Sequence, residues 1–139
     1  MKTVLFVCIH NSARSQMAGV FLNDLGQGQF KAESAGLEAG TMNPNVVKVM
    51  AELGYYLSKN ECKSVFKFHE EGRRYDYVIK VCDQLNGERC PIFPGANHQL
   101  HWNLEDPSSF QGTPDEVLEF TRKVRDQVKA KVEDFIRNA

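Results

Sequence analysis

Apolar and polar positions follow two different periods along the chain, one typical of buried strands and one of amphipathic helices. Continuous apolar runs at 3–8 and 75–82 end at polar residues, which is the pattern of a strand buried on both faces. Residues 29–36 and 98–104 are the other two strands in this interpretation. Segments with helical spacing separate the strands. Strands that alternate with helices predict an α/β fold, in which a parallel sheet is covered on both faces and joined by right-handed crossovers.

The first two helices have recognisable ends. Helical spacing begins at Ser15, and Gly26 is expected to end that helix. The second helix has Asn43 as its N-cap, a proline in its first turn and Gly54 as its C-cap. Its predicted apolar stripe consists of Val47, Met50 and Leu53. Residues 58–72 are ambiguous, with a short helix around 62–68 as our interpretation.

The last segment predicts a long amphipathic helix. Thr113 and Glu116 form a capping box around Pro114. The apolar stripe that follows keeps a spacing of three and four residues and consists of Val117, Phe120, Val124, Val128, Val132 and Phe135.

Composition narrows the class of protein. A chain of 139 residues fits one domain, which we expect to span 1–139. A formal net charge of −1 argues against nucleic acid or an anionic membrane surface as the main partner. No apolar run approaches the roughly 18 residues that a bilayer span requires. The sequence therefore predicts a globular domain that binds neither nucleic acid nor membrane.

The first residues imitate a secretory signal without meeting its requirements. The apolar core of "MKTVLFVCI" is short, and polar residues follow it without a small-residue cleavage pattern. We interpret this run as a strand and expect a cytoplasmic protein. In a reducing cytosol the four cysteines are candidates for thiol, redox or metal chemistry rather than structural disulfides.

Two of these cysteines end predicted strands. Cys8 and Cys82 each follow a valine at the carboxyl end of a buried run. Ligands of open parallel sheets bind outside the carboxyl ends of the strands. We therefore expect the functional site at this edge.

The turn after Cys8 has the residues of an anion site. Backbone N–H groups and a helix N-terminus converge where such a turn opens a helix. Arg14 supplies a planar fork suited to an oxyanion, Ser15 can donate to a thiolate, and Asn11 tolerates left-handed backbone. The alternative is a buried thiol that merely ends a strand. The candidate oxyanion-binding residues are Ile9, His10, Asn11, Ser12, Ala13, Arg14 and Ser15.

The segment "CIHNSARSQMA" resembles the phosphate-binding loop of low-molecular-weight protein tyrosine phosphatases and of the thioredoxin-coupled arsenate reductases that share their fold. The segments "ESAG" (33–36) and "HWNLEDP" (101–107) match both families, whereas "VCDQLNGERCPIFPG" (81–95) resembles the reductases. The resemblance covers essentially the whole chain. It implies a three-layer sandwich of the phosphotyrosine protein phosphatase I type, with a four-stranded parallel sheet in the order 2-1-3-4.

The resemblance also implies roles. Cys8 would be the nucleophile, Arg14 the oxyanion ligand, Asp106 the general acid, and Cys82 and Cys90 the relay thiols. The expected activity is reduction of arsenate, with phosphate or sulfate as oxyanion mimics, thioredoxin as reductant, no cofactor and a monomeric protein.

Two other functions stay open at this point. A tyrosine phosphatase would need Cys8, Arg14 and Asp106 alone, with the other two thiols in a protective role. A non-catalytic thiol redox or oxyanion sensor would need none of the turnover steps. Cys82 and Cys90 are the residues that favour the reductase.

We expect no metal site. The spacing of Cys82, Cys90, His98 and His101 is unlike that of the tight CxxC pairs of structural zinc sites. Some relatives bind potassium through acidic residues, but Gly19 and Lys63 stand at the matching positions here, and the Lys63 charge is a candidate replacement for the ion. Cys62 lies outside any motif and is interpreted as a packed thiol.

Overall fold

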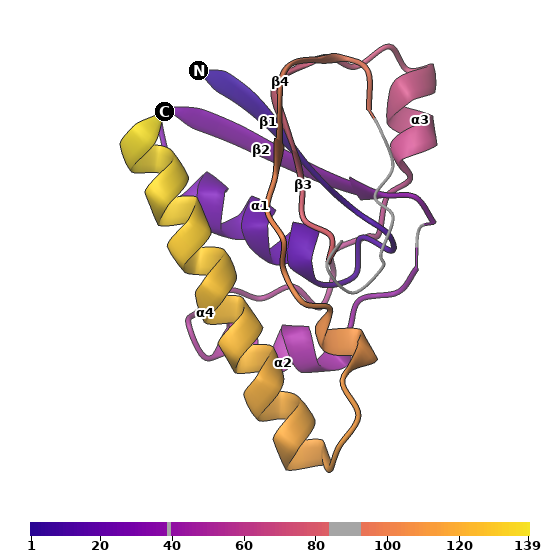
Figure 1. Cartoon of the computed structure of the whole chain (residues 1–139), viewed down its shortest axis with the longest axis vertical. Coiled ribbons are helices and arrows are strands. Elements are labelled where there is room, and N and C mark those ends of the chain that lie inside the picture. The colour runs from indigo at the N-terminus through magenta and orange to yellow at the C-terminus, as the bar shows by residue number, and fades with distance from the viewer. Residues whose placement is uncertain (39, 84–92) are drawn as a thin grey trace.

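A computed structural model describes residues 1–38, 40–83 and 93–139, and its strands form one sheet (Figure 1). The strands are β1 (Lys2–Cys8), β2 (Phe30–Gly36), β3 (Tyr75–Lys80) and β4 (Ala96–His101). They are all parallel and lie in the order β2-β1-β3-β4. The predicted parallel sheet and its 2-1-3-4 order are confirmed.

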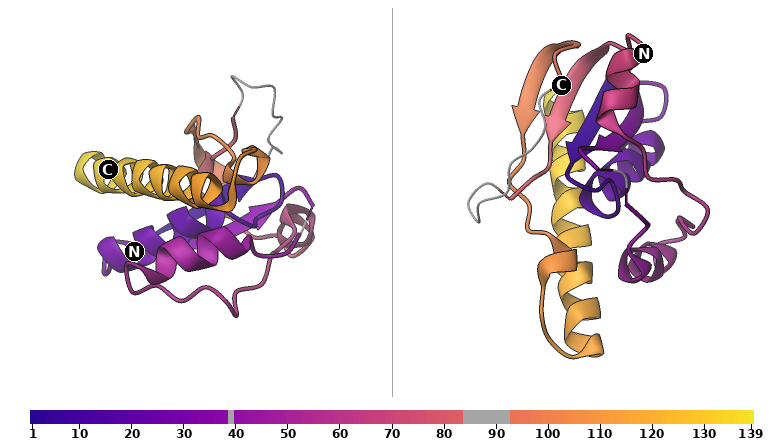
Figure 2. Two further views of the ribbon diagram at one scale, coloured as in Figure 1. Left: turned by 90° about the horizontal axis from the view of Figure 1, so that it is seen from below. Right: turned by 90° about the vertical axis from the view of Figure 1, so that its right-hand side faces the viewer.

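Helices cover both faces of this sheet. They are α1 (Arg14–Leu25), α2 (Pro44–Ala51), α3 (Val65–Glu70) and α4 (Pro114–Asn138), and a 3₁₀ turn spans Pro107–Ser109. α4 packs against both α1 and α2, as the views in Figure 2 show, whereas α3 packs on β2 from the other face. Helices on either side of one sheet make the three-layer sandwich that was expected.

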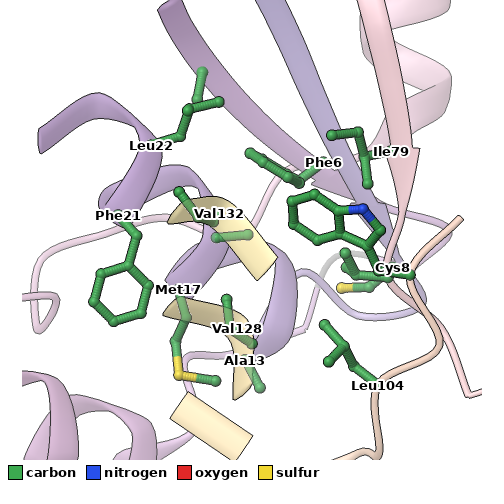
Figure 3. Close-up of a cluster of buried hydrophobic side chains, with 14 of the residues drawn as sticks. Phe6, Cys8, Ala13, Met17, Phe21, Leu22, Ile79, Leu104, Val128 and Val132 are labelled. Atoms are coloured by element: carbon green, nitrogen blue, oxygen red, sulfur yellow. The ribbon is translucent and has the colours of Figure 1, made fainter. Parts of the chain in front are cut away.

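Alternate residues of β1 enter two separate hydrophobic clusters. Phe6 and Cys8 belong to the larger cluster, which α1 and α4 complete, and Figure 3 shows side chains from these elements meeting there. Leu5 and Val7 belong to the smaller cluster, which includes Phe68 of α3. Because β1 is buried on both faces, its carboxyl end is held from two sides.

Both predicted N-terminal caps are present. The Asn43 side chain accepts hydrogen bonds from two backbone N–H groups in the first turn of α2. Thr113 and Glu116 form the predicted capping box at the start of α4. The α4 stripe is buried at Val124, Val128, Val132 and Phe135, and half-buried at Val117 and Phe120.

The predicted stripe of the second helix is wrong in part. Met50 is buried as expected, but the other buried residues of α2 are Val46 and Val49. Leu53 is 40% exposed. The helix ends at Ala51, so that Leu53 lies in the following turn and its side chain no longer follows the helical period.

Two strand boundaries also differ from the prediction. β3 ends at Lys80, which leaves Cys82 two residues beyond the strand, and β4 runs from Ala96 to His101 rather than over 98–104. An apolar run can continue past the carboxyl end of a strand into a buried loop, so hydrophobicity alone does not show where the strand ends. Among the described residues, no helix is long and apolar enough to cross a bilayer.

Candidate active site

The loop between β1 and α1 surrounds the sulfur of Cys8 with hydrogen-bond donors. Cys8 is 2% exposed. The backbone N–H of Asn11 donates to its Sγ at 3.1 Å, and the Ser15 Oγ lies 2.9 Å from the same atom. A sulfur that receives hydrogen bonds is stabilised as the thiolate, which is the nucleophilic form.

The carbonyl groups of this loop are turned outward. Those of four loop residues accept N–H groups from the segment after β2, at 2.8–3.1 Å. In a trans peptide the N–H points opposite to its carbonyl, so the following N–H groups are directed inward. The pairs are Cys8 with Leu37, Ile9 with Glu38, His10 with Gly40, and Ser12 with Asn43.

The loop residues differ in exposure as an anion cradle requires. Asn11, Ala13, Arg14 and Ser15 are buried, Ile9 and Ser12 are half-buried, and His10 is exposed. The buried members fix the loop, whereas His10 faces solvent. Asn11 has a left-handed backbone with φ of 56°, as its residue type predicted.

The structure brings Asp106 to the same site. The Arg14 Nη2 lies 3.8 Å from the Asp106 Oδ2, and the two side chains are 4% and 17% exposed. Arg14 also donates from Nη1 to the carbonyl oxygen of Leu104 at 2.9 Å. The segment after β4 therefore places a carboxyl group beside the guanidinium of the loop.

Asp106 is itself held in place by the turn that follows it. Its Oδ1 accepts the N–H of Ser108 at 2.9 Å, and its Oδ2 accepts the hydroxyl of Ser109 at 3.0 Å. Sequence reasoning missed these two serines. An aspartate followed by proline and two serines is a known turn pattern, so the signal was present.

Gly36 permits the close approach of β2 to the loop. A Cβ at this position would lie 2.7 Å from the backbone nitrogen of Asn11 and 2.7 Å from the carbonyl oxygen of Ile9. No side chain fits there without moving the loop. This glycine is the last residue of "ESAG", and the contact gives the segment a physical role.

Cys82 lies next to the end of β1. β1 and β3 are neighbours, and the N–H of Val81 donates to the carbonyl of Val7 at 2.9 Å. Cys82 is fully buried and belongs to the same hydrophobic cluster as Cys8. It is disulfide-bonded, whereas Cys8 and Cys62 are free. Cys90, the second predicted relay thiol, lies outside the described residues.

Cys62 is nearer to this site than the sequence indicated. Burial raises the pKa of the Cys62 thiol, and the nearby Cys8 raises it further. The next residue, Lys63, donates its backbone N–H to the Asn11 Oδ1 at 2.9 Å. The segment around Cys62 thus supports the loop through the side chain of Asn11.

The positions matched to a potassium site have other contacts. Gly19 faces Ser34, with 4.0 Å between a Cβ built at Gly19 and the Ser34 Cβ. Lys63 lines a cavity of about 330 Å³ together with Gln16 and Ser34. Within the described parts of the chain, no cluster of three or more His, Cys, Asp or Glu side chains could hold a metal ion.

Comparison with known proteins identifies related sequences over the whole chain. The family described as low molecular weight phosphotyrosine protein phosphatase matches residues 3–139. A relative from Synechocystis, named glutaredoxin arsenate reductase, is 36% identical over 98% of this chain and 97% of its own length.

Solved structures of arsenate reductases superpose on nearly the whole chain. A structure titled "An arsenate reductase in the phosphate binding state" superposes with a TM-score of 0.79 and 36% identity, covering 99% of this chain and 98% of the other. A thioredoxin-dependent arsenate reductase from Corynebacterium glutamicum superposes with a TM-score of 0.61 and 27% identity, covering 96% of this chain and 62% of the other.

Proposed function

The chain belongs to the low molecular weight phosphotyrosine protein phosphatase family, and on that premise we propose that it is an arsenate reductase. Its relatives named arsenate reductase match almost the full chain. Arsenate and phosphate are both tetrahedral oxyanions, so a cradle of inward N–H groups with one guanidinium suits either.

In the first step the Cys8 thiolate attacks arsenic(V). A sulfur–arsenic bond forms, and one arsenate oxygen leaves as water after the Asp106 carboxyl gives it a proton. Arg14, which is held by Leu104 and faces Asp106, neutralises the remaining oxygens. The buried donors on the sulfur keep Cys8 ready for attack.

In the second step Cys82 reduces the adduct. Its thiolate attacks the Cys8 sulfur, and a Cys8–Cys82 disulfide forms as the sulfur–arsenic bond breaks. The electron pair of that bond passes to arsenic, which leaves as arsenite. Two thiols are oxidised and arsenic gains two electrons, so the step balances. Burial of both cysteines in one cluster supports this transfer.

In the third step Cys90 attacks the Cys82 sulfur and releases the Cys8 thiolate. Cys8 is then free to begin the next turnover. Thioredoxin then reduces the remaining disulfide, as the name of the Corynebacterium relative suggests. The Synechocystis relative makes glutaredoxin the alternative to test.

We place the enzyme in the cytoplasm as a monomer. Its relay starts from reduced thiols, and the cytosol keeps thiols reduced. Cys8, Arg14 and Asp106 all come from one chain, so a second copy is not required to complete the site.

The observation that carries the proposal is that Cys82, two residues beyond β3, is buried in the same cluster as Cys8 at the end of the neighbouring strand β1. A tyrosine phosphatase needs only the Cys8 loop and Asp106 for turnover, and the second buried thiol would have a protective role alone. A sensor needs no general acid. The reductase is the only one of the three functions whose turnover requires both Asp106 and Cys82.

Serine variants of the cysteines test the proposal. Arsenate-dependent NADPH consumption is measured with thioredoxin and its reductase, next to hydrolysis of p-nitrophenyl phosphate. Cys82→Ser and Cys90→Ser should each lose steady-state arsenate turnover while any phosphatase activity survives. Cys62→Ser is the matched control and should keep turnover. Unchanged turnover in Cys82→Ser contradicts the relay, and replacing thioredoxin by glutaredoxin identifies the reductant.

A further inference from the structure

The side chain of Gln16 is buried next to the active-site loop and makes hydrogen bonds with both ends of its amide. Gln16 is 5% exposed. Its Nε2 donates to the Asn11 Oδ1 at 3.1 Å and to the carbonyl oxygen of Glu61 at 3.0 Å. Its Oε1 accepts the side-chain amide of Asn60 at 3.2 Å. The amide therefore connects the loop to a segment more than forty residues away.

The direction of these hydrogen bonds is fixed by backbone groups. The carbonyl of Glu61 can only accept, so the Gln16 atom that faces it is the nitrogen. The backbone N–H of Lys63 can only donate, so the Asn11 atom that faces it is the oxygen. Since Asn11 has its oxygen on this side, its amide nitrogen faces Ser15.

This direction continues to the nucleophile. The Asn11 Nδ2 donates to the Ser15 Oγ at 2.7 Å. Ser15 has one hydroxyl hydrogen, and with its oxygen accepting from Asn11 that hydrogen is free to point at the Cys8 Sγ, 2.9 Å away. The Asn11 N–H donates to the same sulfur. Cys8 is thus an acceptor in both contacts, which favours its thiolate over its thiol.

We infer that Gln16 is a positioning residue for Cys8. It holds the Asn11 side chain with its oxygen turned away from Ser15, and through Ser15 it keeps a hydroxyl hydrogen directed at the sulfur. Gln16 does not contact the substrate or the reacting atoms. The inference rests on the role proposed above for Cys8, but it concerns the state of the thiol before any substrate binds.

If Gln16 had a purely structural role, its loss would affect Cys8 no more than the loss of another amide that attaches α1 to the fold. Asn23 lies on the same helix, and its side-chain amide also makes two hydrogen bonds, to the N–H and the carbonyl of Ala32. Both of these hydrogen bonds join Asn23 to Ala32, and neither involves a residue of the loop. Asn23→Leu is therefore a matched control for the loss of an amide that attaches α1 to the rest of the fold.

The test measures the rate at which iodoacetamide alkylates Cys8 in the reduced, full-length protein from pH 5 to 9. Peptide mass spectrometry separates Cys8 from the other cysteines. In Gln16→Met, which keeps the size but cannot donate, the pH of half-maximal reactivity should rise by about 0.5–1 unit, equivalent to roughly 3- to 10-fold slower alkylation at low pH. Gln16→Glu should shift the profile further, because its carboxylate faces two acceptors.

A second measurement shows whether the effect passes through Ser15. In a Ser15→Ala background, Gln16→Met should produce less than half of the shift that it produces in the wild-type protein. Urea denaturation shows whether each variant is folded. If Gln16→Met does not fold, the same measurements are made on Gln16→Glu.

The inference is overturned if the Gln16→Met profile coincides with that of the wild type and of Asn23→Leu. It is equally overturned if the full shift persists without the Ser15 hydroxyl. The alkylation assay contains no arsenate, so its result does not depend on whether the protein reduces arsenate. A failure of the Gln16 inference can therefore be distinguished from a failure of the proposed reductase activity.

Discussion

Replacing Gly36 by alanine should damage both the stability of the fold and the reactivity of Cys8. Gly36 is the partner of Cys8 in the β1–β2 register. An added Cβ would lie 2.7 Å from the Asn11 nitrogen, 2.7 Å from the Ile9 oxygen and 2.9 Å from the His10 carbonyl carbon. All three are backbone atoms, so no side-chain rotation relieves the overlap.

The size of the effect follows from how firmly both sides are held. Gly36 donates its N–H to the carbonyl of Lys63 at 2.8 Å, and Leu37 donates to the carbonyl of Cys8 at 3.1 Å. Ordinary contacts begin near 3.4 Å, so β2 and the loop must separate by about 0.7 Å. Overpacking of this kind costs about 1–3 kcal/mol. We expect a loss of about 2 kcal/mol, which lowers the melting temperature of a chain this size by roughly 8 °C.

Gly19→Ala is the matched control, since its Cβ would meet only the Ser34 Cβ at 4.0 Å. Alanine in place of glycine within a helix should stabilise the protein by about 0.5–1 kcal/mol. The two substitutions thus have opposite signs. Urea unfolding gives both values, and alkylation of Cys8 should slow in Gly36→Ala alone. A Gly36→Ala protein with wild-type stability and reactivity would refute the close approach as a requirement of the site.

Two further predictions concern stability away from the loop. Arg125 is 8% exposed and donates to the carbonyl of Val49 in the last turn of α2, so Arg125→Met should lower the free energy of unfolding by about 2 kcal/mol. The control is Arg137→Met, whose side chain is 70% exposed and whose loss should cost less than about 0.5 kcal/mol. Urea titration measures both values. Hydrogen bonds from Thr3 hold the pKa of Asp76 below its ordinary 3.8, so its ionised form is favoured in the folded state. Asp76→Asn should therefore be less stable than wild type above pH 4, and the difference should disappear as the pH falls through the lowered pKa; a difference that stays constant down to pH 2 contradicts this.

The parallel sheet and the cysteine loop could be predicted because each depends on residues close together in the sequence. The burial of β1 on both faces is encoded in one apolar run, and the donors to Cys8 lie within seven residues of it. The capping residues of α2 and α4 are equally local. Such features follow from residue type and spacing alone.

The contacts that hold the loop could not be predicted because they join distant segments. The link between Gln16 and Glu61 spans 45 residues, and that between Arg14 and Leu104 spans 90. No periodicity connects such positions, and a backbone carbonyl gives no signal in the residue type. The predicted end of α2 was wrong for a related reason, since only tertiary packing decides where an eight-residue helix ends.

These long-range contacts have a consequence for the chemistry. Arg14 is fixed from the β4 side by Leu104, and Asn11 is fixed from the other side by Lys63. The oxyanion ligand and the donors to the nucleophile are thus positioned by different parts of the chain. Substitutions on the Leu104 side should weaken oxyanion binding while leaving the Cys8 alkylation profile intact. Substitutions on the Lys63 side should shift that profile while phosphate still binds. Separate responses of this kind are expected because the two hydrogen bonds reach the loop from different segments and end on different loop residues.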